Sequence, residues 1–145
     1  MAPSKELTNR LEDTLRRANN VLLKQGRSIL VNLEISALQF NTLLSIREVG
    51  SMTMGDVCKN LFVACSTATD LADRMERIEL VERVRDDKDR RVIRLRLLPR
   101  GNEVIDAVIA ERQRFIGEVL KEYTEQEYLE LSRGLELLAE RMELI

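Results

Sequence analysis

Apolar residues recur at helical spacing from the beginning of the chain. Between residues 5 and 25, charged positions separate apolar ones that lie three or four apart, which is the pattern of an amphipathic helix. Gly26 follows, and glycine commonly ends a helix because it adopts left-handed backbone angles without strain. The apolar face of this predicted helix consists of Leu7, Leu11, Leu15, Ala18 and Leu22.

Three shorter helices are predicted in the middle of the chain. Ser36 and Gln39 have the spacing of a capping box, and they begin a helix that ends near Gly50. Thr53 is a second N-cap and begins a short helix. A third helix over residues 65–78 has hydroxyl and charged side chains on its outer face. Its apolar face consists of Ala68, Leu71, Ala72 and Met75.

A β-hairpin is predicted over residues 80–98. In its second half Ile93, Leu95 and Leu97 alternate with other side chains, a period of two that buries one face of a strand. The tip, residues 86–91, holds no apolar residue. A single hairpin is not stable by itself in water, so this one must pack on the helices before it and project its charged tip into solvent.

Two further helices follow the hairpin. Pro99 is tolerated at the first position of a helix, and Thr124 with Glu127 has the form of another capping box. The ends of the chain, 5–25 and 100–144, have broad apolar faces and little core left to cover. They form either a helical bundle within one monomer or, as we expect, the interface of a two-fold dimer.

The net charge of −2 conceals an uneven distribution. Residues 81–100 carry eight basic and four acidic side chains, whereas residues 101–145 carry five basic and eleven acidic ones. Positive potential is therefore concentrated at the hairpin, which indicates an anionic partner such as nucleic acid.

Composition excludes several functional classes. The 145 residues are 44% hydrophobic but only 3% aromatic, which suits a helical domain with a real core. No apolar run approaches the ~20 residues of a membrane span and no secretory signal is evident, so we expect a cytoplasmic protein with no membrane partner. Because histidine is absent and the only cysteines are Cys58 and Cys65, we expect no enzyme, no metal site and no cofactor.

The order helix, helix, exposed helix and charged hairpin is that of a winged helix-turn-helix. Over residues 34–101 the chain resembles the MarR family of transcriptional regulators. The matching segments are Ser36–Phe40, Met52–Val57, Cys65–Glu76, Leu80–Arg83, Asp89–Arg91 and Leu97–Gly101. The resemblance implies a single mainly α domain (α+β class) over residues 1–145 with a winged-helix DNA-binding unit at 34–98. It also implies dimerisation helices at 5–25 and 100–144, and a homodimer that binds a pseudo-palindromic double-stranded DNA operator and represses transcription.

Carried onto this sequence, the resemblance assigns DNA contacts to the third helix and the hairpin. Small hydroxyl side chains let a helix lie deep in the ~12 Å major groove. Arg90 or Arg91 at the tip would enter a narrow minor groove. Arg83, Lys88 and Arg94 would neutralise phosphates. The residues that would face the major groove or its phosphates are Ser66, Thr67, Thr69, Asp70 and Arg74.

Three positions refine this picture. Asp70 repels phosphates, so it either meets a cytosine amino group or lies at the edge of the contact. Asp89 is interpreted as a wing-stabilising residue that pairs with the neighbouring arginines. Ala64 stands where a capping residue is common, which costs ~1 kcal/mol of helix stability.

Two hypotheses concern the signal that relieves repression. Cys65 begins the third helix, where the macrodipole favours thiolate, so its oxidation would weaken DNA binding; otherwise Cys65 is structural. A small apolar effector would instead contact Phe40, Phe115 and Tyr123, unless these aromatic residues belong to the core.

An alternative function belongs to another class. A winged-helix protein-interaction module would use the same hairpin against an acidic protein partner. Salt-dependent binding to random duplex DNA discriminates between the two functions, because an interaction module should show none.

Overall fold

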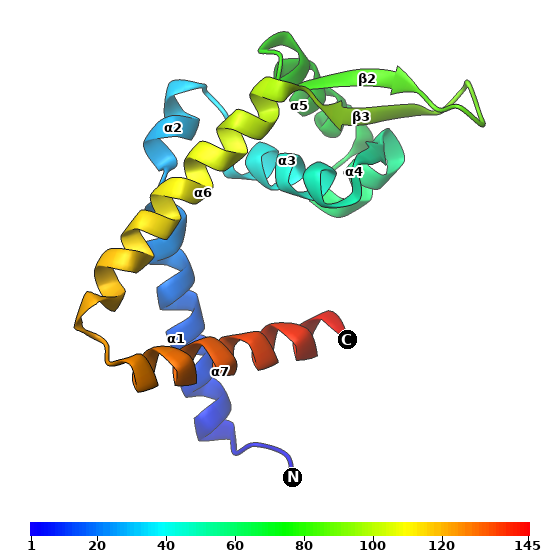
Figure 1. Cartoon of the computed structure of the whole chain (residues 1–145). Helices are drawn as coiled ribbons and strands as arrows, with labels where there is room; N and C mark the ends of the chain where they lie inside the picture. Colours follow the sequence, from blue (N-terminus) through cyan, green and yellow to red (C-terminus); the bar gives the residue numbers. More distant parts are fainter. The chain divides into compact units, whose positions relative to one another are not determined.

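Seven α-helices and three short β-strands form the protein, as described by a computed structural model of residues 1–145 (Figure 1). The chain divides into two compact units, 1–112 and 113–145, which we describe separately. In chain order the elements are α1 (Lys5–Lys24), α2 (Arg27–Asn32), α3 (Ala37–Val49), β1 (Ser51–Thr53), α4 (Met54–Leu61), α5 (Cys65–Arg77), β2 (Val81–Arg85), β3 (Ile93–Leu97), α6 (Pro99–Val119), the 3₁₀ turn η1 (Leu120–Glu122) and α7 (Glu125–Glu143). The predicted fold class, mainly helical with a small sheet, is confirmed.

Side-chain caps begin three of the helices at the predicted positions. Ser36 Oγ accepts a hydrogen bond from the Gln39 backbone N–H at 3.1 Å, and the Gln39 side chain accepts one from the Ser36 N–H at 2.8 Å. Thr53 and Thr124 begin α4 and α7 with the same reciprocal arrangement. Ala64, at the start of α5, supplies no side-chain cap, as the sequence predicts.

Two elements were missed in the sequence-based prediction. α2 follows α1 after a turn in which Gly26 has a φ of 76°, the left-handed conformation expected of it. With six residues, α2 is too short to show a helical period. The three residues of β1 are recognisable only by their pairing with β3, which lies about forty residues further along the chain.

The sheet is antiparallel with strand order β1-β3-β2. Leu95, at the centre of β3, pairs with Met52 of β1 on one side and with Arg83 of β2 on the other. Leu95 is fully buried and its neighbour Arg96 is exposed, which confirms the predicted alternation. The third strand adds pairing that a two-stranded hairpin lacks.

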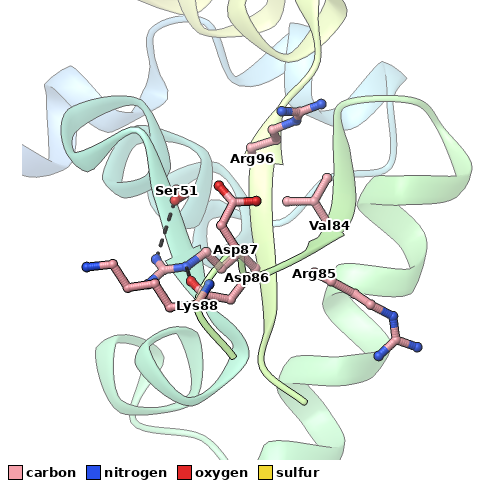
Figure 2. A pocket seen from close by; sticks show the side chains of 8 residues that line it. Ser51, Val84, Arg85, Asp86, Asp87, Lys88 and Arg96 are labelled. Atoms are coloured by element: carbon pink, nitrogen blue, oxygen red, sulfur yellow. Dashed lines mark hydrogen bonds and ion pairs between the residues drawn. The ribbon is translucent and has the colours of Figure 1, made fainter. Parts of the chain in front are cut away.

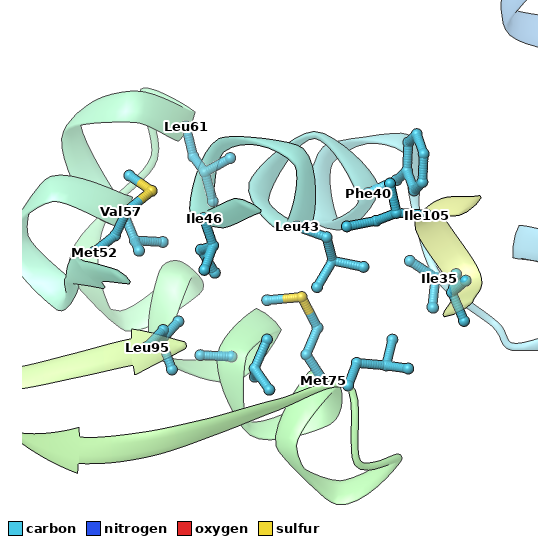
Figure 3. Packing of buried hydrophobic residues seen from close by; sticks show 14 of the residues in the cluster. Ile35, Phe40, Leu43, Ile46, Met52, Val57, Leu61, Met75, Leu95 and Ile105 are labelled. Atoms are coloured by element: carbon cyan, nitrogen blue, oxygen red, sulfur yellow. The ribbon is translucent and has the colours of Figure 1, made fainter. Parts of the chain in front are cut away.

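The core of the first unit lies among α3, α4, α5, the sheet and the first half of α6 (Figure 3). Met75 of α5 points toward Leu43 of α3 in this view, and both side chains are fully buried. Ile105 and Val108 of α6 belong to the same cluster. The beginning of the segment predicted for dimerisation, 100–112, therefore completes the winged-helix core.

α1 and α7 contain no buried residue. Large apolar side chains that remain exposed in the single chain are Leu7, Leu11, Val21 and Leu23 on α1, and Tyr128, Leu129, Leu131, Leu135, Leu137 and Met142 on α7. None of the helices, α1 and α7 included, is long and apolar enough to cross a lipid bilayer.

Candidate nucleic-acid interface

The outer face of α5 is a row of small polar side chains. Ser66, Thr67, Thr69 and Asp70 are exposed, whereas Ala68 faces the core. Thr69 Oγ1 donates a hydrogen bond to the Cys65 carbonyl at 2.8 Å, which leaves the hydroxyl oxygen free to accept. The predicted major-groove residues in the first two turns of α5 therefore lie on one accessible surface.

Arg74, the last predicted contact on α5, faces a different part of the unit. Its Nε donates to the Glu34 carbonyl at 3.0 Å, and its Nη2 lies 2.5 Å from a Glu34 carboxylate oxygen and 3.3 Å from the Leu33 carbonyl. These bonds fasten α5 to the segment between α2 and α3. Arg74 therefore supports the orientation of the helix, and the DNA contact predicted for it stays a prediction.

The guanidinium of Arg83 also forms ion pairs within the first unit. Its Nη2 lies 2.6 Å from Asp73 Oδ1 and its Nη1 lies 2.9 Å from Glu76 Oε1, both on α5. The Arg83 backbone N–H donates to the other Glu76 oxygen at 3.0 Å. Because β2 is thereby tied to α5, Arg83 sets the position of the β2–β3 hairpin, the wing, relative to α5, the recognition helix of the helix-turn-helix.

Replacing Arg83 by alanine is expected to lower the free energy of unfolding by about 1–2 kcal/mol, because two partly exposed carboxylates lose their partner. Chemical denaturation of the variant measures the effect. Arg77→Ala is the matched control, since Arg77 is exposed on α5, the helix that carries both carboxylates, and makes no ion pair. Equal stability of the two variants would contradict this role for Arg83.

The wing tip is organised by Asp86. Its Oδ2 accepts hydrogen bonds from the backbone N–H groups of Lys88 and Asp89, each at 3.0 Å. Its Oδ1 lies 2.5 Å from Nε of Arg94 on the opposite strand. The bond from Arg94 and the two backbone bonds lower the pKa of Asp86 to about 2. Asp86 therefore joins both strands and closes the turn between them.

Replacing Asp86 by asparagine is expected to lower the Tm at neutral pH. The pKa of Asp86 in the folded protein lies below its ordinary value of 3.8, so its stabilising contribution is present above about pH 4 and is lost as the pH falls toward 2. The Tm difference between D86N and the parent protein should accordingly shrink over that interval. A difference that stays constant from pH 7 to pH 2 would refute the ion-pair origin of the effect.

Asp89 makes its side-chain hydrogen bonds only to Arg91. Asp89 Oδ1 accepts from the Arg91 backbone N–H and from Arg91 Nε, both at 3.1 Å. The hydrogen bond from the Arg91 side chain is the largest of the effects that lower the pKa of Asp89. The wing-stabilising role predicted for Asp89 stays a prediction, and the structure adds Asp86 as the residue that spans the turn.

The free positive charge of the wing lies at its tip. The Arg91 side chain is 92% exposed despite its contact with Asp89. Lys88 and Arg90 are exposed and form no ion pair, and the Arg90 carbonyl accepts a hydrogen bond from Arg85 at 2.7 Å. These three side chains are accessible to solvent, and the DNA contacts predicted for them stay predictions.

An open hollow of about 410 Å³ lies at the base of the wing (Figure 2). Arg94 is held there by Asp86 and by a 3.4 Å hydrogen bond to Ser51 Oγ. Arg96 forms an ion pair with Glu82. The lining residues are Ser51, Val84, Arg85, Asp86, Asp87, Lys88, Arg94 and Arg96. Two of the four basic side chains that line the hollow are therefore paired with carboxylates, which leaves Arg85 and Lys88 as its cations without an ion pair.

The candidate effector residues lie in different surroundings. Phe40 is 1% exposed and belongs to the core of the first unit. The guanidinium of Arg112 lies 5.3 Å from the centre of its ring, and Arg112 Nε is buried without a hydrogen bond. Phe115 and Tyr123 belong to the second unit, where Tyr123 is exposed. The contact of Arg112 with Phe40 could not be predicted from the sequence, because the two residues lie 72 positions apart and no motif near Arg112 indicates it.

The known proteins that this chain resembles form one group. The model of the MarR family matches residues 35–93. The chain is 39% identical over 132 residues to the HTH-type transcriptional regulator YsmB of Bacillus subtilis, which covers 91% of this chain and 90% of the relative. It is 31% identical over 109 residues to the HTH-type transcriptional repressor MdtR of the same organism, covering 75% and 70% of the two chains. The solved structure of a MarR family protein from Bacillus stearothermophilus has 39% identity and a TM-score of 0.83, covering 98% of this chain and 99% of that one.

Proposed function

Because this chain belongs to the MarR family of DNA-binding transcriptional regulators, we propose that it is a homodimeric repressor that binds a pseudo-palindromic operator. The observation that carries the proposal is that two exposed surfaces suited to DNA occur on the same unit. One is the exposed hydroxyl face of α5, and the other is the wing tip with its exposed Lys88, Arg90 and Arg91. The similarity to MdtR, a transcriptional repressor, supports the repressor role.

The recognition helix suits the major groove because its leading side chains are short. The hydroxyls of Ser66 and Thr67 are exposed and make no hydrogen bond within the protein, so both can donate to or accept from base edges and phosphates. Asp70 lies beside them and would read a cytosine amino group or face water. The arginines of the wing would lie in the adjacent minor groove, where the potential is most negative.

A two-fold dimer is supported by the exposed apolar faces of α1 and α7. Neither helix buries a residue in the single chain, and each exposes several large apolar side chains, which a partner would cover. A dimer axis would place two recognition helices about one turn of DNA apart, ~34–36 Å. Covering these faces with a second copy therefore also explains how two half-sites are read.

Leu135→Asp is expected to shift the dimer toward monomer, because it places a charge on the exposed apolar face of α7. Sedimentation velocity measures the change, and circular dichroism checks that the helices remain. Gln126→Glu adds the same charge in the first turn of α7 and serves as control. A fully dimeric L135D protein would speak against α7 as part of the interface.

The signal that relieves repression is proposed to be a small ligand or the oxidation of a thiol. The unbonded Nε of Arg112 beside Phe40 supports an effector that carries a hydrogen-bond acceptor on an apolar body. The cytoplasm stays the predicted location, since that is where a regulator of this kind meets its DNA.

Selection of bound fragments from random duplex DNA tests the proposed function. The expected result is an inverted repeat with half-sites one helical turn apart, bound with an affinity that falls steeply as salt is raised. Weak binding to all sequences with no enriched site would overturn the operator proposal. No binding at low salt would favour the alternative, a module that binds an acidic protein.

A further inference from the structure

The side chain of Phe62 lies outside the fold, in the turn that joins α4 to α5. It is 95% exposed, more than any other large hydrophobic residue apart from the two at the chain ends, Met1 and Ile145. It is also the only large hydrophobic residue between positions 50 and 112 that is exposed. The ring therefore contributes nothing to the core of the first unit.

The backbone of Phe62 is strained as well. Its φ of 53° and ψ of 38° are left-handed, a conformation that residues with a Cβ rarely adopt and that glycine or asparagine usually supplies at the end of a helix. The only backbone bond of its N–H is to the Lys59 carbonyl at 3.3 Å, a bond that any residue except proline can make. The fold thus uses the backbone of Phe62, and glycine would provide it with less strain.

The neighbours of Phe62 explain why the turn exists but not why it carries an aromatic ring. Leu61 is buried in the core cluster (Figure 3), and Val63 is partly buried against the same cluster. The left-handed residue between them lets both side chains face inward while its own faces solvent. Strained residues of this kind persist mainly at functional sites.

Phe62 lies close to the hydroxyl face of α5. Ser66 is four residues further along the chain, so the two Cα atoms are at most ~14 Å apart. Base pairs are spaced ~3.4 Å along DNA, and this separation therefore spans about four base pairs, which is within a single half-site. The α4 residues beside the turn, Lys59 and Asn60, are polar and exposed. Phe62 is thus a single apolar group on a polar surface next to the recognition helix.

A single exposed ring suits DNA better than a protein partner. Protein interfaces require a contiguous apolar patch, and no second large hydrophobic residue of this segment is exposed. In the major groove the apolar group on the base edges is the 5-methyl of thymine, which phenylalanine contacts favourably. We propose that Phe62 is a specificity-determining residue that packs against the methyl group of one thymine in each half-site. This inference rests on the proposed function and names a base that its operator contains.

Deoxyuridine, which lacks the methyl group, tests the contact directly. Each thymine of the operator selected from random DNA is replaced in turn, and the affinity of the full-length protein is measured by fluorescence anisotropy. We expect one thymine in each half-site to show a loss of about three- to fivefold, the worth of one buried methyl group. In Phe62→Asn the affinity for the unmodified operator should be about tenfold lower, and the loss at that thymine should disappear.

Thermal unfolding provides a second readout, because a structural role would move it in the opposite direction. Asparagine adopts left-handed angles more readily than phenylalanine, so the Tm of Phe62→Asn should equal or exceed that of the parent by about 2–4 °C. A lower Tm would overturn the inference, since it would show that the ring stabilises the fold. Phe62→Leu keeps an apolar side chain and should retain most of the affinity.

Val49→Asn is the matched control. Val49 is 66% exposed at the end of α3, outside the α4–α5 pair, and valine and asparagine have similar helix propensities. Its affinity and its response to deoxyuridine should equal those of the parent. Normal binding by Phe62→Asn would overturn the inference, and an unchanged thymine response with weaker binding would overturn the methyl contact. If the parent protein binds no duplex DNA, the proposed function itself fails.

Discussion

Replacing Arg90 and Arg91 together by alanine is expected to weaken operator binding by about 100-fold, because each lost contact at a groove or phosphate is worth about 1–3 kcal/mol. Arg90 forms no ion pair and the Arg91 side chain is 92% exposed, so both are available to DNA. The slope of log affinity against log salt should fall by about 1–2, since counterion release scales with neutralised phosphates. Fluorescence anisotropy over a range of salt measures both quantities.

Stability and dimerisation should be unchanged in this variant, because neither arginine contacts the core. Lys121→Ala with Arg133→Ala is the matched control, since it removes two exposed positive charges from the second unit. Equal loss of affinity in both proteins would mean that net charge governs binding. Normal binding by the Arg90 and Arg91 variant would refute the role of the wing tip.

Replacing Gly101 by alanine is expected to lower the free energy of unfolding by about 3 kcal/mol through steric overlap in a packed interior. A Cβ at this position would lie 2.2 Å from the Leu80 carbonyl oxygen and 3.1 Å from Leu97 Cδ2. The same oxygen accepts a hydrogen bond from the Leu98 N–H at 3.0 Å, which joins the two ends of the hairpin. Because the obstacle is backbone, it cannot be relieved by a change of rotamer.

Gly117→Ala in the same helix is the control for this variant. No atom lies within 4 Å of a Cβ there, so alanine should stabilise α6 by about 0.5–1 kcal/mol through helix propensity. The two substitutions are chemically identical and differ only in their surroundings. Similar effects on denaturant midpoints would show that the close approach of Gly101 to Leu80 is unimportant.

Local features of this protein were predictable because their determinants are near one another in sequence. The capping residues Ser36, Thr53 and Thr124 bond to groups three residues away, and each begins a helix at the expected place. The alternation around Leu95 likewise needs only a strand period. The exposed hydroxyls of the recognition helix followed from its apolar face, because an amphipathic helix with one side in the core must present the other.

Partners distant in sequence were not predictable. Arg74 and Arg83 look like free cations in the sequence, yet one bonds to Glu34 forty positions earlier and the other to Asp73 and Glu76. Asp86 was one of three aspartates in the tip, and only the approach of Arg94 from the opposite strand distinguishes it. Fewer basic side chains near the wing therefore remain without an ion pair than the sequence suggests.

The order of helices, the hairpin and the concentration of positive charge at residues 81–100 could be read from the sequence, because periodicity, capping and charge are local properties. Folding was needed to show which charges remain unpaired, that β1 completes the sheet and that α6 enters the core. Ion pairs and strand pairing depend on distances of a few ångströms in space, which chain closure sets and which spacing along the chain does not encode.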